Sequence, residues 1–407
     1  MSTSPTRWAS YSCAVSRANP DDSPLAAIVK DADAPLQVHV YEDAASLARI
    51  EPAWRELICS AGHSEPFMRP EWIRSWWNAF GKAGHLRLVT VWQGERLVGI
   101  LPLMLNRVRR YGIPLRRLGA PANVHSPRVD CMVSPDVTGV IDAIWRHVAG
   151  MEGQWDIFEL PRLLSDSPVI RSLSARAETD GFRFGLWQAE SSPFINTATE
   201  WNRYLSGRSR NFRKELRRKT RQLSQTGRIA LEVVVDPVAV PEALETGFEI
   251  EADGWKGRAG SAMKSNDDVR RFYHELAGRM AHSGLLRLHF LELDGERIAF
   301  DLSIEFGGRL YSLKSGFRDG LSASSPGLVL LGLMLEHYMA TELEEIDLLG
   351  EQDEFKQRWT SNARSHHWFV CFAPTPRASA VHRIKFGLIP RIKKLGKRLK
   401  AVGHTAS

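Results

Sequence analysis

Residues 86–99 read LRLVTVWQGERLVG, and residues 286–299 read LRLHFLELDGERIA. Each copy has the pattern of a strand, a tight turn at a glycine and a second strand, and each follows a segment rich in aromatic residues. The two copies lie two hundred residues apart, which is the spacing of domains and not of a solenoid repeat. The chain is therefore predicted to contain two related units, so that the fold of one unit describes both.

Composition agrees with a globular protein of two cores. The chain has 407 residues, of which 43% are hydrophobic and 25% are charged. Its longest apolar run, residues 328–335, is far shorter than the roughly 20 residues that a membrane-spanning helix needs. The four cysteines are widely spaced and form no CxxC pair, which predicts a protein of the reducing cytoplasm without a disulfide framework.

The two ends of the chain differ from its centre. Residues 1–35 are rich in Ser, Ala, Asp and Pro and lack the apolar segment of a signal peptide, so they are predicted to form a disordered leader. No Asp or Glu follows Glu354, whereas twelve Lys and Arg do. Residues 375–407 thus form a basic tail, which also carries large apolar side chains. This composition suits a helix on an anionic lipid surface at the inner membrane face, a contact with an acidic partner, or a solvated tail.

The pattern of helices and strands divides the centre into three segments. Residues 36–198 alternate helices and strands, and residues 229–374 are predicted to follow the order ααβββαβαβ. Between them, residues 199–228 have a helical and very basic pattern, which predicts a linking helix that bridges the units or binds an anion. The fold class is therefore α/β with mixed sheets. In the second unit the helices are expected at 240–255, 267–282, 328–341 and 352–359, and the strands at 286–293, 297–306, 309–317, 345–349 and 367–372.

A loop of small residues supplies the strongest chemical signal. Residues 321–327 read LSASSPG and lead directly into the apolar helix expected at 328–341. Backbone N–H groups at a helix start lie at the positive end of the helix dipole, which suits a phosphate or a pyrophosphate. No Lys follows the glycine, so the loop is not a Walker motif. A helix start without any ligand remains the alternative.

Several motifs of the second half together resemble a known family. They are GERIAFD at 295–301, YSLKSGF at 311–317, SPG at 325–327, IDLLG at 346–350 and FKQRW at 355–359. This set resembles the GNAT-fold acyltransferases associated with bacterial cellulose and exopolysaccharide biosynthesis, which are related to the FemAB-type tandem transferases. The resemblance extends over residues 37–373 and is concentrated in the second half. It implies two tandem GNAT-like domains, of which the second holds acyl-CoA. The first is degenerate, because its corresponding segment has no Gly-rich helix start.

The resemblance also implies roles for particular residues, with acyl-CoA as co-substrate and no metal. Two acids, Glu251 and Asp301, are the candidate bases; an ordinary cross-strand pair of Asp301 with Lys314 is the alternative. The family commonly carries a Tyr at the position of Phe355, so Tyr311 or the departing thiol must act as the acid. The CoA-binding residues implied are Ser315, Gly316, Phe317, Ser325, Pro326, Gly327, Leu328 and Lys356, and the acceptor-binding residues are Trp255, Lys256, Lys314 and Asp347.

The expected activity is transfer of an acyl group, such as acetyl, from CoA to an amine or a hydroxyl. The acceptor is a small molecule, a sugar or a polysaccharide precursor, attacked directly in a ternary complex. No specific nucleic-acid partner is expected for this activity. Two alternatives stay open: a FemAB-like transferase that uses aminoacyl-tRNA and contacts its phosphates through Arg208 to Arg221, and a non-catalytic accessory protein of a polysaccharide synthase. The acceptor, the acyl chain and the oligomeric state are left open.

Overall fold

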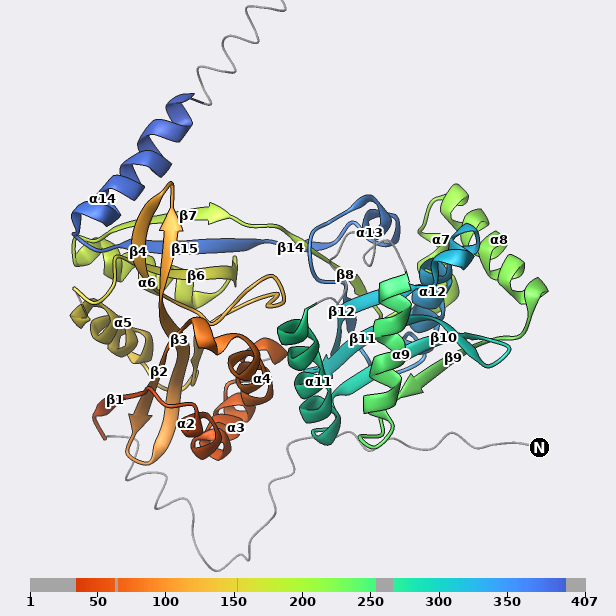
Figure 1. The fold of residues 1–407 in the computed structure, drawn as a ribbon, viewed down its shortest axis with the longest axis horizontal. Helices are drawn as coiled ribbons and strands as arrows, with labels where there is room; N and C mark the ends of the chain where they lie inside the picture. The colour runs from red at the N-terminus through yellow and green to blue at the C-terminus, as the bar shows by residue number, and fades with distance from the viewer. Residues whose placement is uncertain (1–33, 63–64, 152, 254–265, 393–407) are drawn as a thin grey trace, which may run out of the picture.

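The computed structural model describes residues 34–62, 65–151, 153–253 and 266–392 (Figure 1). The leader lies almost entirely outside this part of the chain, as do Trp255, Lys256 and the tail beyond Ile392. The chain forms two units, each with a mixed β-sheet that has helices packed on it (Figure 1). The α/β class with two mixed sheets is thus confirmed.

The first sheet has eight strands. Its order is β1 (Leu36–Tyr41), β2 (Gly84–Gln93), β3 (Arg96–Arg110), β4 (Ile113–Gly119), β6 (Ile157–Leu164), β15 (His366–Phe372) and β7 (Arg183–Gln188), and β5 (Met132–Val133) pairs with β3. The second sheet has seven strands in the order β9 (Ile229–Val234), β10 (Leu286–Leu293), β11 (Glu296–Phe306), β12 (Arg309–Phe317), β13 (Glu345–Asp347), β8 (Ser192–Asn196) and β14 (Ala363–Arg364).

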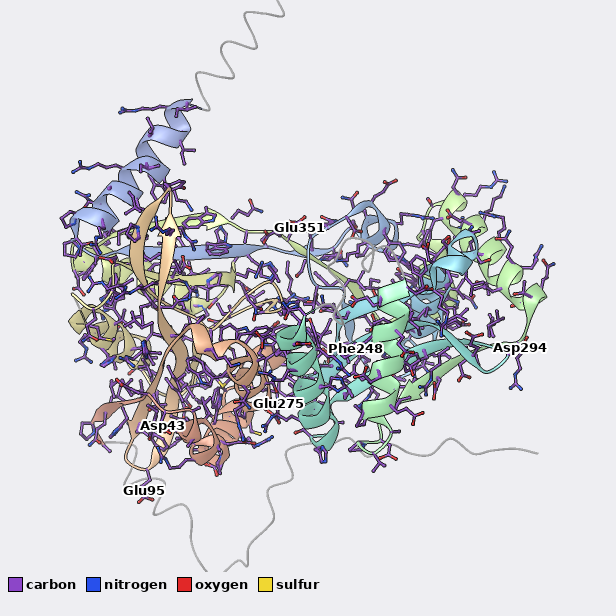
Figure 2. The ribbon with its side chains drawn as sticks, viewed as in Figure 1. Asp43, Glu95, Phe248, Glu275, Asp294 and Glu351 are labelled. Atoms are coloured by element: carbon purple, nitrogen blue, oxygen red, sulfur yellow. The ribbon has the colours of Figure 1, made fainter. Side chains whose placement is uncertain are left out.

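The two sheets share one plan. Along both paths every neighbouring pair is antiparallel except the fourth and fifth strands, β4 with β6 and β12 with β13, which are parallel. The repeated hairpins also carry a bulge at the same place, since the register shifts at Val91/Trp92 and again at Leu291/Glu292. Figure 2 labels residues of the two turns, Glu95 and Asp294, at opposite outer ends of the molecule. The duplication predicted from residues 86–99 and 286–299 is therefore present in the strand order, the pairing and the bulges.

Each sheet receives its sixth strand from the other unit. Strand β8 precedes the second unit in sequence but lies between β13 and β14, and β15 follows the second unit but lies between β6 and β7. The predicted limits at 198 and 374 therefore differ from the limits of the sheets, because each leaves one strand in the opposite unit. A strand's own apolar pattern does not specify which pair of strand edges it will join.

The helices occupy equivalent places in the two units. Helices α2 (Ala45–Arg49), α3 (Glu51–Ser60) and α4 (Pro70–Phe80) follow β1, and α9 (Val240–Asp253) and α11 (Asp267–His282) follow β9. Helices α2 and α3 meet at Ile50, just before Pro52. The remaining helices are α5 (Val140–Gly150), α6 (Pro168–Thr179), α7 (Trp201–Ser206), α8 (Arg210–Thr226), α12 (Pro326–Tyr338), α13 (Glu354–Trp359) and α14 (Pro376–His382).

A common core joins the units where α4 and α11 face each other (Figure 1). The rings of Trp72 and Phe272 meet edge to face at 5.6 Å, and those of Phe67 and Tyr311 at 5.4 Å. At the edge of this contact Asn78 donates to Glu275, which Figure 2 labels, at 2.6 Å. The two units therefore share buried apolar surface in addition to the exchanged strands.

The described part of the basic tail is one continuous helical segment. Helix α14 runs into a π-helical stretch, Arg383–Leu388, and the helix continues through Pro390 to Ile392. A proline inside a helix is expected to divide it, but Pro390 does not divide this segment. A proline lacks the N–H that would bond to a carbonyl in the preceding turn. The π-helical turns just before Pro390 bond with a different spacing from an α-helix, which changes the pattern at this position. None of the helices in the described residues is long and apolar enough to cross a membrane.

Candidate functional site

A cavity of about 610 Å³ opens in the second unit between β11, β12 and α12. This is the size of a typical small-molecule site. One wall is apolar and is formed largely by the side chains of α12, a helix that is almost entirely buried. The opposite side carries ionisable groups from several elements. The apolar lining includes Phe300, Phe317, Leu328, Leu330, Leu331 and Met334, and the ionisable lining is Glu215, Glu251, Asp301, Lys314, Asp353, Lys356 and Arg358.

The start of α12 is more ordered than the small-residue pattern predicts. A 3-10 helix, Asp319–Ser324, precedes it, and Ser325 adopts a left-handed conformation with φ of +51°. The Ser325 N–H donates to the Ser322 carbonyl, and the N–H groups of Leu328 and Val329 donate to the Ser325 carbonyl. These three amides are therefore engaged within the loop, and Pro326 has no N–H. A phosphate at this helix start has to rely on Gly327 and on neighbouring basic side chains.

Strand β12 brings Ser315, Gly316 and Phe317 to the cavity. A Cβ added at Gly316 would lie 2.9 Å from Cε1 of Phe300 and 3.1 Å from Cα of Glu251. Helix α9 thus rests directly on the backbone of β12 at this point, which only glycine permits. The close approach places Glu251, whose residue is 1% exposed, at the cavity wall.

The candidate base Asp301 is surrounded by polar side chains. Asp301 accepts hydrogen bonds from the hydroxyl groups of Ser303 and Ser312, the latter at 2.5 Å. His289 lies behind it, with Nδ1 3.8 Å from Asp301 Oδ1 and Nε2 2.8 Å from the Tyr338 hydroxyl. Burial lowers the pKa of His289 to about 3, so its ring is neutral near pH 7. The hydroxyl groups of Ser303 and Ser312 hold the Asp301 carboxylate in one orientation.

Lys314 lies where two cavities meet. The strand register pairs it with Leu302, and its ammonium lies 5.6 Å from the centre of the Tyr273 ring. A second cavity of about 200 Å³ lies between the units and shares Leu313, Lys314, Leu349 and Gly350 with the larger one. Glu351, near the centre of the molecule in Figure 2, also lines it.

His125 supplies a side chain of the first unit to this second cavity. Its Nδ1 lies 3.2 Å from the Tyr273 hydroxyl. Burial, and after it the charge of Lys314, lowers the pKa of His125 to about 4. The ring is therefore neutral near pH 7. Lys356 lines the larger cavity and not the second one. Its Nζ donates to the carbonyls of Leu349 at 2.7 Å and Glu351 at 3.1 Å.

Two of the expected site residues lie elsewhere. Tyr311 and Asp347 are both fully buried, and neither lines the 610 Å³ cavity. Burial raises the pKa of Tyr311, so its phenol is a poorer acid than usual. Asp347 is bound by Arg128 at 2.5 Å and by Arg364 at 3.0 Å. Both side chains therefore lie in the contact between the units and not in the cavity, and their expected roles as acid and acceptor ligand stay predictions.

Arg128 is the centre of that contact and was not predicted. Its guanidinium, 3% exposed, binds Glu65 and Asp347 as well as Ser192 at 2.7 Å and His366 at 3.0 Å. The sequence offers no signal for this network, since its members come from both units and lie up to 238 positions apart. No group of three or more His, Cys, Asp or Glu among the described residues is placed to hold a metal ion.

Comparisons with known proteins show what the second unit and the whole fold resemble. Residues 210–357 match the family described as "Acetyltransferase (GNAT) domain". Among solved structures, "Crystal structure of FemX" matches with a TM-score of 0.53 and 10% identity, covering 77% of this chain and 95% of that chain. The C-terminal domain of a putative lysylphosphatidylglycerol synthetase from Agrobacterium fabrum matches with a TM-score of 0.51 and 12% identity, covering 83% and 95%. No curated protein matches the sequence.

The family match coincides with the cavity. Every lining residue of the 610 Å³ cavity except Arg358 falls within residues 210–357. Residues 210–357 of the second unit are therefore similar to the GNAT acetyltransferase domain, and most of the chain shares its fold with the two solved structures. At such low identity the structural likeness defines the fold alone.

Proposed function

We propose that the protein is an acyl-CoA-dependent acyltransferase that acts on an amine or a hydroxyl. The observation that carries the proposal is the 610 Å³ cavity, which lies within the GNAT match and combines an apolar wall, an exposed strand backbone and basic groups. These are the features that a pantetheine thioester with an acyl chain at one end and phosphates at the other requires.

Each part of the donor has a matching part of the cavity. The pantetheine amides lie along Ser315 to Phe317 of β12, whose backbone can pair with them as a strand edge does. The acyl chain lies on the apolar wall of α12. The phosphates lie near Gly327, with Lys356 and Arg358 as the cations that line the same cavity.

The chemistry is a direct transfer. The acceptor nitrogen or oxygen attacks the thioester carbonyl, the new bond to the acyl carbon forms, and the carbon–sulfur bond breaks to release the thiol. The acceptor proton passes to a cavity carboxylate, Glu251 or Asp301, and the departing thiolate takes up a proton in turn. Because two hydroxyl groups fix its orientation, Asp301 can also position the acceptor. A positioned base contributes about 10² to 10⁴ in rate.

The acceptor enters between the two units. The 200 Å³ cavity meets the larger one at Lys314, so an acceptor there lies beside the thioester carbon. Its lining includes the polar side chains of Arg162, Glu190 and His125. This lining suits a hydroxyl-rich or charged acceptor such as a sugar or a polysaccharide precursor. Exopolysaccharide biosynthesis is the context that the sequence resemblance suggests.

Ligand binding tests the donor. Acetyl-CoA and longer acyl-CoAs are expected to raise the unfolding temperature, since a ligand at a hundred times its dissociation constant stabilises by about 2.7 kcal/mol. Gly327→Glu adds a carboxylate where a phosphate approaches, so calorimetry should show loss of acyl-CoA binding with the fold intact. Gly278→Glu on α11, where a Cβ meets no atom within 4 Å, is the control and should bind normally. Unchanged affinity in Gly327→Glu would remove the phosphate site.

A FemAB-like transferase is the second candidate. It is favoured by the basic helix α8, which adjoins the cavity through Glu215. Such an enzyme would bind aminoacyl-tRNA and not acyl-CoA, so a comparison of the two ligands distinguishes the candidates. An accessory protein without activity would bind neither.

A further inference from the structure

The outer surface of α8 carries an unusual excess of positive charge. The helix has one acid, Glu215, and this side chain binds Arg358 at 2.5 Å. Within the part of the chain that the structure describes, none of the helix's own cations forms an ion pair with a carboxylate. The seven cations are Arg210, Arg213, Lys214, Arg217, Arg218, Lys219 and Arg221.

Five of these cations form one exposed face. Arg210, Lys214, Arg217, Arg218 and Arg221 are all exposed and follow the spacing i, i+4, i+7, i+8 and i+11, which places them side by side on a helix. The opposite side of α8 is buried against α12 and α13. From Arg210 to Arg221 this basic face is about 17 Å long. The residues that anchor the helix are Phe212, Leu216 and Leu223.

The charges do not serve the fold. Like charges three and four residues apart repel one another and weaken a helix. The anchoring side chains hold α8 in place without them: the Phe212 ring meets Trp359 at 4.7 Å, and Leu216 packs against Gly332 of α12. A face of this kind is expected to receive its counter-charges from another molecule.

The side of α8 that faces away from the basic face borders the mouth of the larger cavity. Lys219 donates to the carbonyl of Ala323 in the 3-10 helix before α12, and the neighbouring Ser322 lines the cavity. Glu215, one turn earlier on α8, lines it as well. Helix α8 lies on the outer flank of the second unit, beside α12 and away from the first unit (Figure 1). A partner on the basic face lies across α8 from the donor cavity, about one helix diameter away, and does not cover the acceptor cavity between the units.

We propose that this face of α8 docks an acidic acyl carrier protein, which delivers its acyl group on a phosphopantetheine arm. The inference rests on the proposed function and specifies its donor, because coenzyme A and carrier proteins present the same pantetheine thioester. In the transfer the acceptor forms its bond to the acyl carbon, the carbon–sulfur bond breaks, and the carrier leaves with its free thiol. The acceptor proton goes to the cavity carboxylate, and the thiolate is protonated.

A protein partner fits this face better than RNA does. Recognition of unpaired RNA ends relies on aromatic platforms for the bases. On α8 the aromatic side chain, Phe212, is buried, and the exposed face consists of cations and small polar groups. A straight basic stripe matches the acidic helix of a small folded partner in both charge and length.

Binding of defined donors tests the proposal. The probes are a fluorescently labelled, hexanoyl-loaded acyl carrier protein, hexanoyl-pantetheine and hexanoyl-CoA, measured with the full chain. Arg217→Glu combined with Arg221→Glu should weaken carrier binding at least tenfold, which is about 1.4 kcal/mol, and leave hexanoyl-pantetheine binding unchanged. The matched control replaces Arg146 and Arg171, two exposed arginines of the first unit, by Glu. It should leave the binding of the carrier and of hexanoyl-pantetheine unchanged.

Each alternative result has a defined meaning. Equal carrier affinity in the wild type and the α8 variant would overturn the proposal, as would tighter, α8-dependent binding of a labelled tRNA. Binding of hexanoyl-CoA without any binding of the carrier would overturn this inference and leave the proposed function standing. Failure of hexanoyl-pantetheine and hexanoyl-CoA alike to bind the wild type would overturn the proposed function itself.

Discussion

Replacing Arg128 by Ala is expected to cost about 3 kcal/mol of unfolding free energy, a large share of the stability of an ordinary protein. The guanidinium is 3% exposed and makes hydrogen bonds to Glu65, Asp347, Ser192 and His366. Removal of one partner from a buried ion pair typically costs 3–5 kcal/mol, because the other charge stays buried without compensation. The lower end of that range applies here, since Asp347 keeps Arg364 at 3.0 Å.

Glu65 gives this prediction a pH signature. Burial already raises the pKa of Glu65 even with Arg128 beside it, and loss of the guanidinium raises the pKa further. A carboxyl whose pKa is higher in the folded than in the unfolded protein makes the folded state bind more protons, so stability increases as pH falls. The unfolding free energy that Arg128→Ala loses relative to the wild type should therefore be smaller at pH 5 than at pH 8.

Urea unfolding of the full chain at several pH values measures both effects. The control is Arg176→Ala, which removes a surface pair with Asp142 whose arginine is 46% exposed and should cost less than about 1 kcal/mol. A loss below 1 kcal/mol in Arg128→Ala, or a loss independent of pH, would contradict the description of the network as a buried, charged contact between the units.

Two further predictions concern the chemistry and the tail. Of Glu251→Gln and Asp301→Asn, one is expected to lower the turnover number about 10² to 10⁴-fold, because a single proton is taken per transfer. Near wild-type rates in both variants would exclude each carboxylate as the base. Deletion of residues 389–407 removes six Lys and Arg, each worth roughly 1 kcal/mol near an anionic surface before screening, while Phe386 stays packed on Phe372. Co-sedimentation with anionic vesicles at low salt should therefore fall; equal binding by the truncated chain, or no binding by the full chain, would assign the tail another role.

Local signals in the sequence were sufficient for much of the fold. Helix α4 begins at Pro70 as expected, since proline suits a first turn. Helix α11 has the expected bounds, with Asn266 capping its N-terminus. Residues 286–293 also form a strand as predicted. These features depend on residues close together in the chain, and so their pattern carries the information.

The errors arise from long-range pairing. The strand at 366–372 was recognised as a strand, but its place between β6 and β7 depends on edges formed some two hundred residues earlier. Asp301 and Lys314 were expected in one groove, with Tyr311 as a candidate acid, and the register of β11 and β12 shifts at Leu302/Ser303. A bulge changes which residues face the same side, and alternation alone does not reveal it. Hence Asp301 lines the cavity and Tyr311 does not.

The exchange of β8 and β15 also has a consequence during protein synthesis. The ribosome makes β15 only after all the strands of the second sheet, so the first sheet stays open between β6 and β7 from the synthesis of Gln188 to that of Phe372. Two unpaired strand edges face that gap, and they accept a strand from any chain that offers one. On a polysome, where nascent copies are close together, β15 of one copy can fill the gap of another and produce linked dimers. We therefore expect the share of correctly closed chains to depend on how soon each chain's own β15 fills the gap.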